Sequence, residues 1–580
     1  MSSRPQVRER RGFVNAAHGQ VHYRIAGSGP PVVLLHDAPR SSTAYRDLLR
    51  WLGEEFTVVA PDLPGYGNST PLPASPQSGS TAPPPAIADF ARAVDAALEA
   101  LGIGQCVLYG FHGSSKIALE LAAQGSDRLS GVILEGLSLP LSPPEADFIG
   151  RYMRPLELSD DGSHLAREWT RVRDQHRFYP WFAKSSRSRI AADIPEEKQL
   201  HRAVIDLFSS GRHYSSAYAA AMRHHAIPLI GRIRTRTVIA CRADDPLFRY
   251  LDALPENRPA HVTVERLPAE NEAWREKLRD LFRDLSQRSA TRRTELPDPL
   301  RIGSASTEVR GYVDLPHGQI MVRRRGNGSR RPVLLLHETP GCSAQLQPLL
   351  QALSGDRVAI ACDLPGLGDS DPLPNPDVAA YRDALLGMLD VLQLASIDVI
   401  AEFTAAPLAL ELARAAPERV NRLVLDGVFV FSASERRQLW KSYCPPLRPS
   451  WDGAHLHALW HRLRDQELNW PWFDGSASAI RKRDPELGAE RLQTILVDIM
   501  KRPEHYGDAC LAAFEYPLKD VIGEVRQPVL LPQVADDIRY QWTRKVARRL
   551  ANAQLQPRSA VLAERAKAWS AFLDGGEASA

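Results

Sequence analysis

Cysteine is scarce and scattered in this sequence. The 580 residues contain six cysteines, and none of them stands at a spacing typical of metal ligands. Such a pattern is typical of a protein from a reducing compartment, so we expect a cytoplasmic location. We also expect neither a metal ion nor another cofactor.

Long apolar runs and an excess of one charge are also absent. No uninterrupted apolar stretch reaches the roughly 20 residues that a membrane-spanning helix needs. The first residues, MSSRPQVRERRGF, carry charge without the apolar segment of a secretory signal. The formal net charge is +3, and no run of Lys and Arg suggests a surface for nucleic acid. We therefore expect a small-molecule substrate or ligand, with no membrane and no nucleic acid as partner.

Self-similarity, in contrast, is abundant. VVLLHDAPRSS, which begins at Val32, recurs as VLLLHETPGCS, which begins at Val333, and APDLPGYGNSTPLP recurs as ACDLPGLGDSDPLP. The repeating unit is as long as a whole domain, which excludes a short solenoid repeat. We predict two domains, residues 1–287 and 306–580, joined by a polar, proline-containing linker at 288–305. Duplicated domains commonly reproduce the pairing of a homodimer, so we expect the halves to pack as an intrachain pseudo-dimer.

Within each copy, short runs rich in Val, Ile and Leu alternate with helical patterns. PVVLLH, FTVVAPD and CVLYG are typical of buried parallel strands, whereas AIADFARAVDAALEALG has apolar residues at helical spacing before a glycine. The alternation predicts an α/β fold with a doubly wound, mostly parallel sheet in each half. Helices rich in Trp and Arg interrupt it at about 140–230 and 431–522, and we expect each segment to form a helical lid.

Three motifs, in the same order in both halves, carry a family resemblance. LLHDAP and LLHETP resemble an H-G-x-P oxyanion loop, and DLPGYGNS and DLPGLGDS resemble a D-x-x-G-x-G-x-S turn. VLYGFHGSS takes the place of the strand-turn-helix that presents a nucleophile in G-x-S-x-G. Both halves thus resemble the α/β-hydrolase fold, of the lidded kind related to epoxide hydrolases and haloalkane dehalogenases. The resemblance implies two tandem α/β-hydrolase domains and a hydrolase-like enzyme, but the function depends on the site.

The catalytic residues that the resemblance implies are replaced. His112 stands at the nucleophile position of the first half, and Phe403 stands there in the second. The histidine that family members carry near the end of the domain is absent from both LPAENEAW and LQPRSAVLAERAKAW. Neither half can therefore assemble a Ser-His-Asp triad from the family's positions. We interpret both triads as degenerate.

An imidazole at the tip of this turn can still perform chemistry. His112 can act as a general base or a nucleophile on a small apolar ester or activated carbonyl, oriented by Asp245 or Glu135. The resemblance places the backbone amides of Ala38 and Gly113 as oxyanion donors. A lyase or isomerase reaction fits the same residues better than ordinary esterase turnover does.

Two other hypotheses remain open. In the first, His112 and the carboxylates are hydrogen-bonded structural residues of a pseudo-hydrolase, which serves as a ligand-binding or protein-interaction scaffold. In the second, the protein has a cofactor-free oxygenase-like activity. Loss of turnover on replacing His112 distinguishes an enzyme from a scaffold.

Further positions allow both a binding and a packing interpretation. Asp37 replaces the glycine of the oxyanion loop, and it either faces inward as an acid-base group or faces solvent. Phe178 and Trp181 of the first lid either line an apolar substrate pocket or stack on the main domain. The corresponding non-catalytic site of the second half comprises Phe403, Thr339, Asp537 and Asp426.

Overall fold

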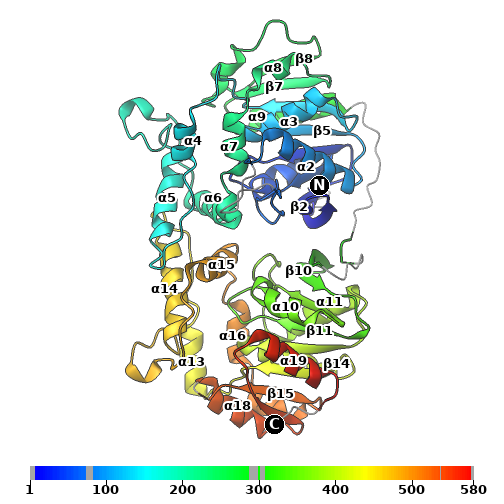
Figure 1. Ribbon diagram of the computed structural model, residues 1–580, viewed down its shortest axis with the longest axis vertical. Coiled ribbons are helices and arrows are strands. Elements are labelled where there is room, and N and C mark those ends of the chain that lie inside the picture. The colour runs from blue at the N-terminus through cyan, green and yellow to red at the C-terminus, as the bar shows by residue number, and fades with distance from the viewer. Residues whose placement is uncertain (1–6, 74–82, 287–297, 301–306, 536, 577–580) are drawn as a thin grey trace, which may run out of the picture. The chain divides into compact units, whose positions relative to one another are not determined.

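The computed structural model describes residues 7–73, 83–286, 298–300, 307–535 and 537–576. The chain folds into two compact units (Figure 1). The first unit comprises Met1–Glu157 and Glu168–Asp298, and the second comprises Leu158–Arg167 and Pro299–Ala580. Most of the linker predicted at 288–305 lies outside the described residues. Each unit contains one eight-stranded sheet covered by helices, so the predicted fold class of two tandem α/β-hydrolase domains is confirmed.

The first sheet is mostly parallel. Its strand order is β1-β2-β4-β3-β5-β6-β7-β8, and only the pairs β1–β2 and β2–β4 are antiparallel. The strands are β1 (Arg10–Ala16), β2 (Gly19–Ala26), β3 (Pro31–Leu35), β4 (Thr57–Pro61), β5 (Cys106–Phe111), β6 (Leu129–Glu135), β7 (Thr237–Arg242) and β8 (Val262–Leu267).

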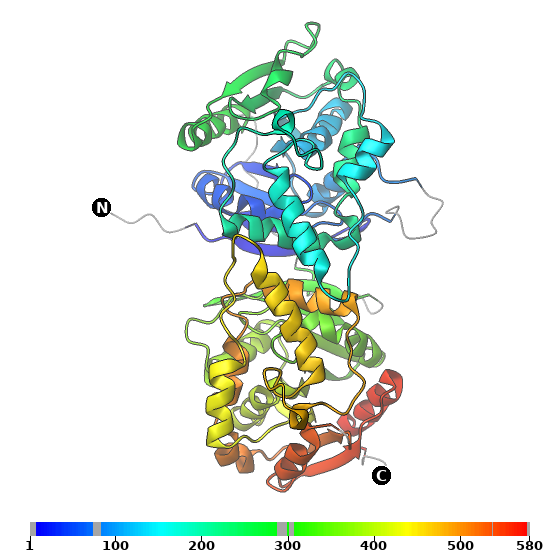
Figure 2. The same ribbon diagram turned by 90° about the vertical axis from the view of Figure 1, so that its left-hand side faces the viewer.

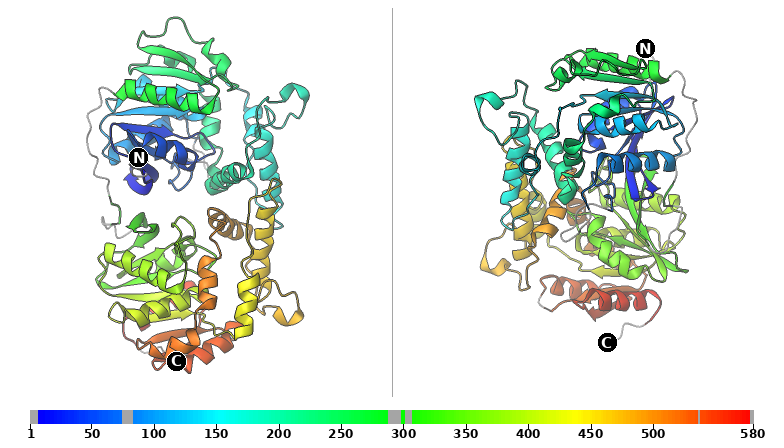
Figure 3. Two further views of the ribbon diagram at one scale, coloured as in Figure 1. Left: turned by 180° about the vertical axis from the view of Figure 1, so that it is seen from behind. Right: turned by 45° about the horizontal axis from the view of Figure 1, so that its top comes forward.

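Helices cover both faces of this sheet, which explains why its strands are continuously apolar. Val33 and Leu35 of β3 pack with α2 (Ile87–Ala100) and α3 (Gly113–Gln124) on one face. Val32 and Leu34 pack with α1 (Arg46–Leu52) and α9 (Asn271–Ser286) on the other. Because successive side chains of a strand point to opposite faces, both sets of positions must be apolar. Figure 3 shows α9, in green, across the face of the sheet.

A helical segment separates β6 from β7, as the lid prediction requires. It contains α4 (Ala146–Tyr152), α5 (Ser163–Gln175), α6 (Glu197–Ser210), α7 (Ser216–Arg223) and α8 (Ile227–Ile230). Of these helices, α7 packs on α2 and α3. Figure 2 turns the lid helices of each unit toward the viewer, cyan in the first unit and yellow in the second.

The second sheet repeats the same strand order, β9-β10-β12-β11-β13-β14-β15-β16. Its strands are β9 (Val309–Leu315), β10 (Gly318–Arg325), β11 (Arg330–Leu336), β12 (Arg357–Cys362), β13 (Ile397–Glu402), β14 (Val420–Asp426), β15 (Val529–Gln533) and β16 (Ala553–Pro557). The helices around this sheet are α10 (Gln347–Leu353), α11 (Val378–Val391), α12 (Ala406–Ala415), α18 (Arg539–Ala547) and α19 (Leu562–Leu573). The segment between β14 and β15 contains α13 (Ala433–Ser442), α14 (Ala454–Leu468), α15 (Ala489–Met500), α16 (Asp508–Glu515) and α17 (Leu518–Val521). Among the described residues, no helix has the length and apolar character needed to cross a membrane.

Candidate active site

The candidate site lies at the carboxyl ends of four neighbouring strands. In the order of the sheet these are β3, β5, β6 and β7, which are followed or ended by Asp37, His112, Glu135 and Asp245. Parallel strands bring such ends to one edge of a sheet, which is where open α/β sheets bind ligands. The fold therefore gathers one imidazole and three carboxylates from distant parts of the chain.

His112 occupies the tip of a strained turn between β5 and α3. Its φ of 48° and ψ of −115° lie in a region that side chains rarely adopt. The turn is held by the His112 amide, which donates to the Glu135 carbonyl at 2.9 Å, and by the Ser115 amide, which donates to the His112 carbonyl at 3.0 Å. At Gly110 a Cβ atom would lie 2.6 Å from the Ser114 carbonyl oxygen, so this position needs glycine. The backbone thus has the geometry of a nucleophile elbow although it carries histidine.

Asp245 is the carboxylate that bonds to the His112 ring. Its Oδ2 lies 2.6 Å from His112 Nε2, and its Oδ1 accepts a hydrogen bond from the Leu247 amide at 2.8 Å. The second bond orients the carboxylate toward the ring. The His112 side chain remains 31% exposed, so a small molecule can reach the imidazole.

The surrounding charges set the protonation of this pair. Burial by itself would lower the pKa of His112, but the hydrogen bond and charge of Asp245, together with the charges of Asp37 and Glu135, raise that pKa above its ordinary value. Burial by itself would raise the pKa of Asp245, yet the imidazole lowers it. The pair therefore favours a charged imidazole beside a charged carboxylate.

Asp37 faces inward and takes the position predicted for an oxyanion. Its Oδ1 accepts a hydrogen bond from the Gly113 amide at 3.2 Å. One of the two amides predicted as oxyanion donors is therefore directed at a carboxyl group of the protein itself. Burial raises the pKa of Asp37, which favours the protonated form. Of the two orientations considered for Asp37, the structure has the inward one.

Glu135 is buried behind the elbow and does not pair with the imidazole. Its carboxylate accepts hydrogen bonds from the Tyr109 hydroxyl and from Nε1 of Trp274, both at 3.0 Å. Burial raises the pKa of Glu135 to about 7. Sequence reasoning missed Trp274, although it lies in the LPAENEAW segment where the family's histidine is expected.

The lid residues predicted to line the pocket pack within the lid. Trp181 is buried, and its Nε1 donates to the Tyr152 carbonyl at 2.9 Å. The ring of Phe178 packs against the Arg189 guanidinium, whose carbon lies 5.4 Å from the ring centre. Among the described residues, no contact joins either aromatic side chain to His112.

Two lid tyrosines that sequence reasoning missed lie near Asp37 instead. Tyr152 and Tyr218 stack with ring centres 5.6 Å apart. Burial raises the pKa of Tyr152 to about 12, and the charge of Asp37 contributes to the rise for both tyrosines. No sequence signal marked them, because a lid contains many aromatic residues that only pack.

Comparison with known proteins agrees with the fold of the first domain. The family model of the alpha/beta hydrolase fold matches residues 30–270. This part of the chain belongs to the α/β-hydrolase fold family. Haloalkane dehalogenase 2 of Mycobacterium tuberculosis is 32% identical over 122 residues, which are 21% of this chain and 40% of that protein. The soluble epoxide hydrolase of Corynebacterium sp. is 52% identical over 50 residues, which are 9% of this chain and 18% of the relative. The chain thus spans less than half the length of these two curated relatives.

Two solved structures match slightly less than half of the chain at low sequence identity. Epoxide hydrolase A of Mycobacterium thermoresistibile is 17% identical, and the match covers 47% of this chain and 100% of that chain with a TM-score of 0.38. The enol-lactonase of Burkholderia xenovorans is 18% identical, with 46% and 98% covered and a TM-score of 0.36.

The second α/β-hydrolase domain keeps the strained elbow but fills it with an apolar ring. Phe403 has a φ of 36° and is buried, with its ring centre 5.2 Å from the rings of Phe429 and Trp470. The guanidinium carbon of Arg539 lies 5.7 Å from the Phe403 ring. A benzene ring offers neither a nucleophile nor an acid-base group.

The polar residues of the second site are bonded to other neighbours. Asp537 binds Arg539 through both carboxylate oxygens, at 2.8 and 2.7 Å, and Asp426 accepts from Arg558 Nε at 2.8 Å. The Thr339 amide donates to the Thr404 hydroxyl at 2.6 Å. Among the described residues, no group of three or more His, Cys, Asp or Glu side chains is placed to hold a metal ion.

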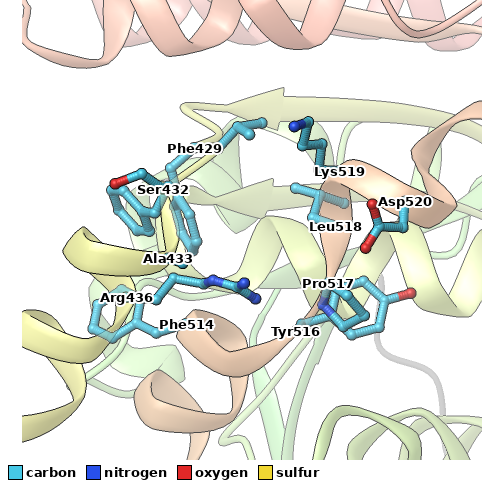
Figure 4. Close-up of a pocket in the computed structure, with 12 residues that line it drawn as sticks. Phe429, Ser432, Ala433, Arg436, Phe514, Tyr516, Pro517, Leu518, Lys519 and Asp520 are labelled. Carbon is cyan, nitrogen blue, oxygen red and sulfur yellow. The ribbon is translucent and has the colours of Figure 1, made fainter.

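A cavity of about 270 Å³ opens beside the second site (Figure 4). The Phe429 ring separates it from Phe403, since Phe429 lines the cavity and also contacts the elbow ring. Arg436 of α13 extends into the space, and Lys519 and Asp520 of α17 lie on the opposite side. The wall therefore combines aromatic rings with two cations and one carboxylate.

Proposed function

We propose that the first domain catalyses proton transfer on a small apolar carbonyl or ester-type substrate, with His112 as the general base, and that the second domain is non-catalytic. The observation that carries this proposal is the 2.6 Å pairing of His112 Nε2 with Asp245 at the tip of the elbow. In the neutral ring, an Nε2–H that donates to Asp245 leaves the lone pair on Nδ1. Nδ1 makes no hydrogen bond to any of the described residues, so it is free to accept a proton from substrate.

The position of Asp37 favours acid-base chemistry over attack by His112 on a carbonyl. Attack would create an oxyanion opposite the Ala38 and Gly113 amides, but the Asp37 carboxyl already accepts the hydrogen bond of the Gly113 amide. An ionised Asp37 would repel the new charge. A protonated Asp37 would instead donate its proton to the carbonyl oxygen while His112 removes the proton from the neighbouring carbon. The C–H electron pair then forms the carbon–carbon double bond of an enol.

Exchange of carbon-bound hydrogen tests this assignment. We expect the protein to accelerate deuterium incorporation next to the carbonyl of 2-pentanone in heavy water, followed by NMR. General acid-base catalysis contributes about 10²–10⁴-fold, so His112→Gln should remove at least 10² of the acceleration. His213→Gln serves as the matched control, because this lid histidine accepts a hydrogen bond from Arg212. Retained exchange in His112→Gln would show that this histidine is not the base.

The cavity of the second domain supports the alternative hypothesis of a ligand-binding scaffold. Its aromatic wall and the cations Arg436 and Lys519 suit a small apolar carboxylate. Isothermal titration with hexanoate tests this function, and Arg436→Gln should weaken the binding. Binding that depends on Arg436 in a protein without any exchange activity would favour the scaffold over the enzyme.

A further inference from the structure

A buried cation in the lid of the second domain has no carboxylate partner. Arg462 of α14 is 3% exposed, and its Nε donates to the Tyr443 carbonyl at 3.2 Å. Its Nη1 has no hydrogen-bond partner among the described residues, and its Nη2 lies 3.9 Å from Cys444 Sγ. A buried charge is costly unless an opposite charge or hydrogen bonds compensate it. The guanidinium also lies over the rings of Tyr443, Trp472 and Tyr506. Among the described residues in contact with Arg462, the sulfur of Cys444 is the group that can become an anion near neutral pH.

The first domain contains a buried ion pair that the second domain lacks. In α5 of the first domain, Arg171 donates from Nε to Glu168 Oε2 at 2.6 Å, and both side chains are 1% exposed. The residue that precedes Arg462 by the same three positions in α14 is Leu459, which is fully buried. The second domain therefore keeps the cation of this pair and replaces its carboxylate with an apolar side chain.

The same comparison shows that Cys444 takes the place of a methionine. Tyr152 and Tyr443 occupy equivalent positions, because the carbonyl of each accepts a hydrogen bond from a lid tryptophan at 2.9 Å. The residue that follows is Met153 in the first domain and Cys444 in the second. A group that can carry a negative charge thus appears next to the arginine in the domain where the carboxylate is lost.

A second thiol lies against the first. Cys510 of α16 is fully buried in the aromatic cluster around Phe403, and Cys444 packs against this cluster. A Cβ atom on Gly507, one turn before Cys510, would lie 3.4 Å from Cys444 Sγ. Burial by itself would raise the pKa of Cys444, but the Cys510 thiol and the Arg462 guanidinium lower it below its ordinary value. Burial raises the pKa of the other five cysteines: Cys106, Cys241, Cys342, Cys362 and Cys510. Cys444 is also the one cysteine that is partly exposed.

We propose that Cys444 and Cys510 form a peroxide-reactive thiol pair, in which Cys444 is a thiolate held by Arg462. The Cys444 sulfur attacks one oxygen of hydrogen peroxide, and the O–O bond breaks. This step leaves a sulfenic acid on Cys444 and a hydroxide that takes up a proton to become water. Cys510 Sγ then attacks Cys444 Sγ, the S–O bond breaks, and the leaving oxygen departs as a second water with the Cys510 proton. The two sulfurs lose two electrons in total, and the peroxide gains them.

The pair lies in the part of the second domain that corresponds to the catalytic region of the first. Cys510 belongs to the same buried cluster as Phe403, the residue at the tip of the second elbow. The second domain has therefore lost the residues of the family's chemistry and holds a reactive sulfur in the same region.

Alkylation of the full-length protein tests the thiolate. Iodoacetamide at pH 7, followed by peptide mass spectrometry, should modify Cys444 at least 10-fold faster than any of the other five cysteines. Leu459→Glu restores to Arg462 the carboxylate that Arg171 has, so it should slow the alkylation of Cys444 at least 5-fold. Leu459→Gln buries a neutral group of the same size and should not slow it. Alkylation of Cys444 no faster than that of the other cysteines would overturn the proposal, and this wild-type result does not depend on the folding of any variant.

Hydrogen peroxide tests the pair. The wild-type protein should lose two thiols and yield a cross-linked peptide that contains Cys444 and Cys510. In Cys510→Ser, dimedone should trap a sulfenic acid on Cys444, whereas Cys444→Ser should yield neither the adduct nor the cross-link. Oxidation of a different cysteine, or a sulfenic acid that accumulates on Cys444 in the wild-type protein, would contradict the proposal.

Discussion

At the scale of the residue, the chemistry of His112 depends on groups that lie far away in the chain. Asp245, which is 133 residues distant, raises the pKa of the imidazole against the effect of burial. A histidine without these neighbours in the same buried turn would have a lowered pKa instead. The proton affinity of the ring is therefore a property of the folded site.

This balance predicts the pH dependence of the proposed reaction. A general base works only in its neutral form and a general acid only in its protonated form, so the rate of exchange should be bell-shaped in pH, with limbs set by the pKa values of Asp37 and His112. The pKa of His112 lies above the ordinary 6.5. Asp245→Asn removes the interactions that raise this pKa and leaves burial, which lowers it. The limb of the pH–rate profile that His112 sets should therefore move to lower pH. The pKa of His112 measured by NMR should fall by the same amount. Asp244→Asn is the control, because Asp244 pairs with Arg242 instead of His112. A pH–rate profile that does not change in Asp245→Asn would contradict the assignment.

The inward position of Asp37 predicts a gain of function. Asp37→Gly frees the Gly113 amide to face an oxyanion beside the Ala38 amide, and one such donor is worth about 10²–10³-fold in rate. We expect the release of p-nitrophenol from p-nitrophenyl acetate to increase by about 10-fold or more, through attack by His112. The double variant with His112→Gln should lose this gain. An unchanged rate would mean that the two amides do not act as oxyanion donors.

At the scale of the element, both elbows keep a positive φ at the tip although their side chains differ. The φ values of 48° at His112 and 36° at Phe403 arise where a buried strand turns directly into a helix. The strand and helix on either side hold this turn, so the strain does not depend on the residue at the tip. The element is thus preserved where the chemistry is lost.

Breaking the buried ion pair of α5 should cause a large loss of stability in the first domain. Glu168 accepts hydrogen bonds from Arg171 at 2.6 Å and from Arg154 at 3.1 Å, so Glu168→Gln leaves two cations without a counter-charge. Breaking a buried ion pair on one side costs about 3–5 kcal/mol. Urea unfolding of the full chain should show a loss of this size, whereas Glu197→Gln, an exposed residue at the start of α6, should change the free energy of unfolding by less than about 0.5 kcal/mol.

At the scale of the whole molecule, each unit has its own sheet and its own hydrophobic core. Leu34 lies in the core of the first unit, and the corresponding Leu335 lies in that of the second. Both leucines are fully buried, so each can be used to perturb one unit.

This organisation predicts that core substitutions act on one unit at a time. Replacing a buried leucine with alanine costs about 2–5 kcal/mol. In differential scanning calorimetry, Leu34→Ala should lower the midpoint temperature of one unfolding transition, and Leu335→Ala should lower that of a different transition. Leu141→Ala, at a side chain that is 89% exposed, serves as the control. A single transition whose midpoint temperature both substitutions lower equally would show that the two units unfold together.

Much of the fold was predictable because it depends on local patterns. PVVLLH contains β3 and CVLYG contains most of β5, since a strand covered on both faces must be apolar throughout. The elbow was found for a similar reason, because Gly110 and the residues around His112 form a motif of fixed spacing. The inward direction of Asp37, the bonds of Glu135 to Tyr109 and Trp274, and the approach of the lid tyrosines could not be found in this way.

The sequence by itself therefore determined the two tandem α/β-hydrolase domains, the short apolar runs that form their strands, and the presence of His112 and Phe403 where family members carry a nucleophile. Only the tertiary structure decided that Asp245 pairs with the imidazole, that Asp37 occupies the oxyanion position, and that Arg462 lies against Cys444. The physical reason is the separation along the chain over which each effect acts. Burial and periodicity act on neighbouring residues, whereas hydrogen bonds and charges at a site join groups that come together only when the sheet is formed.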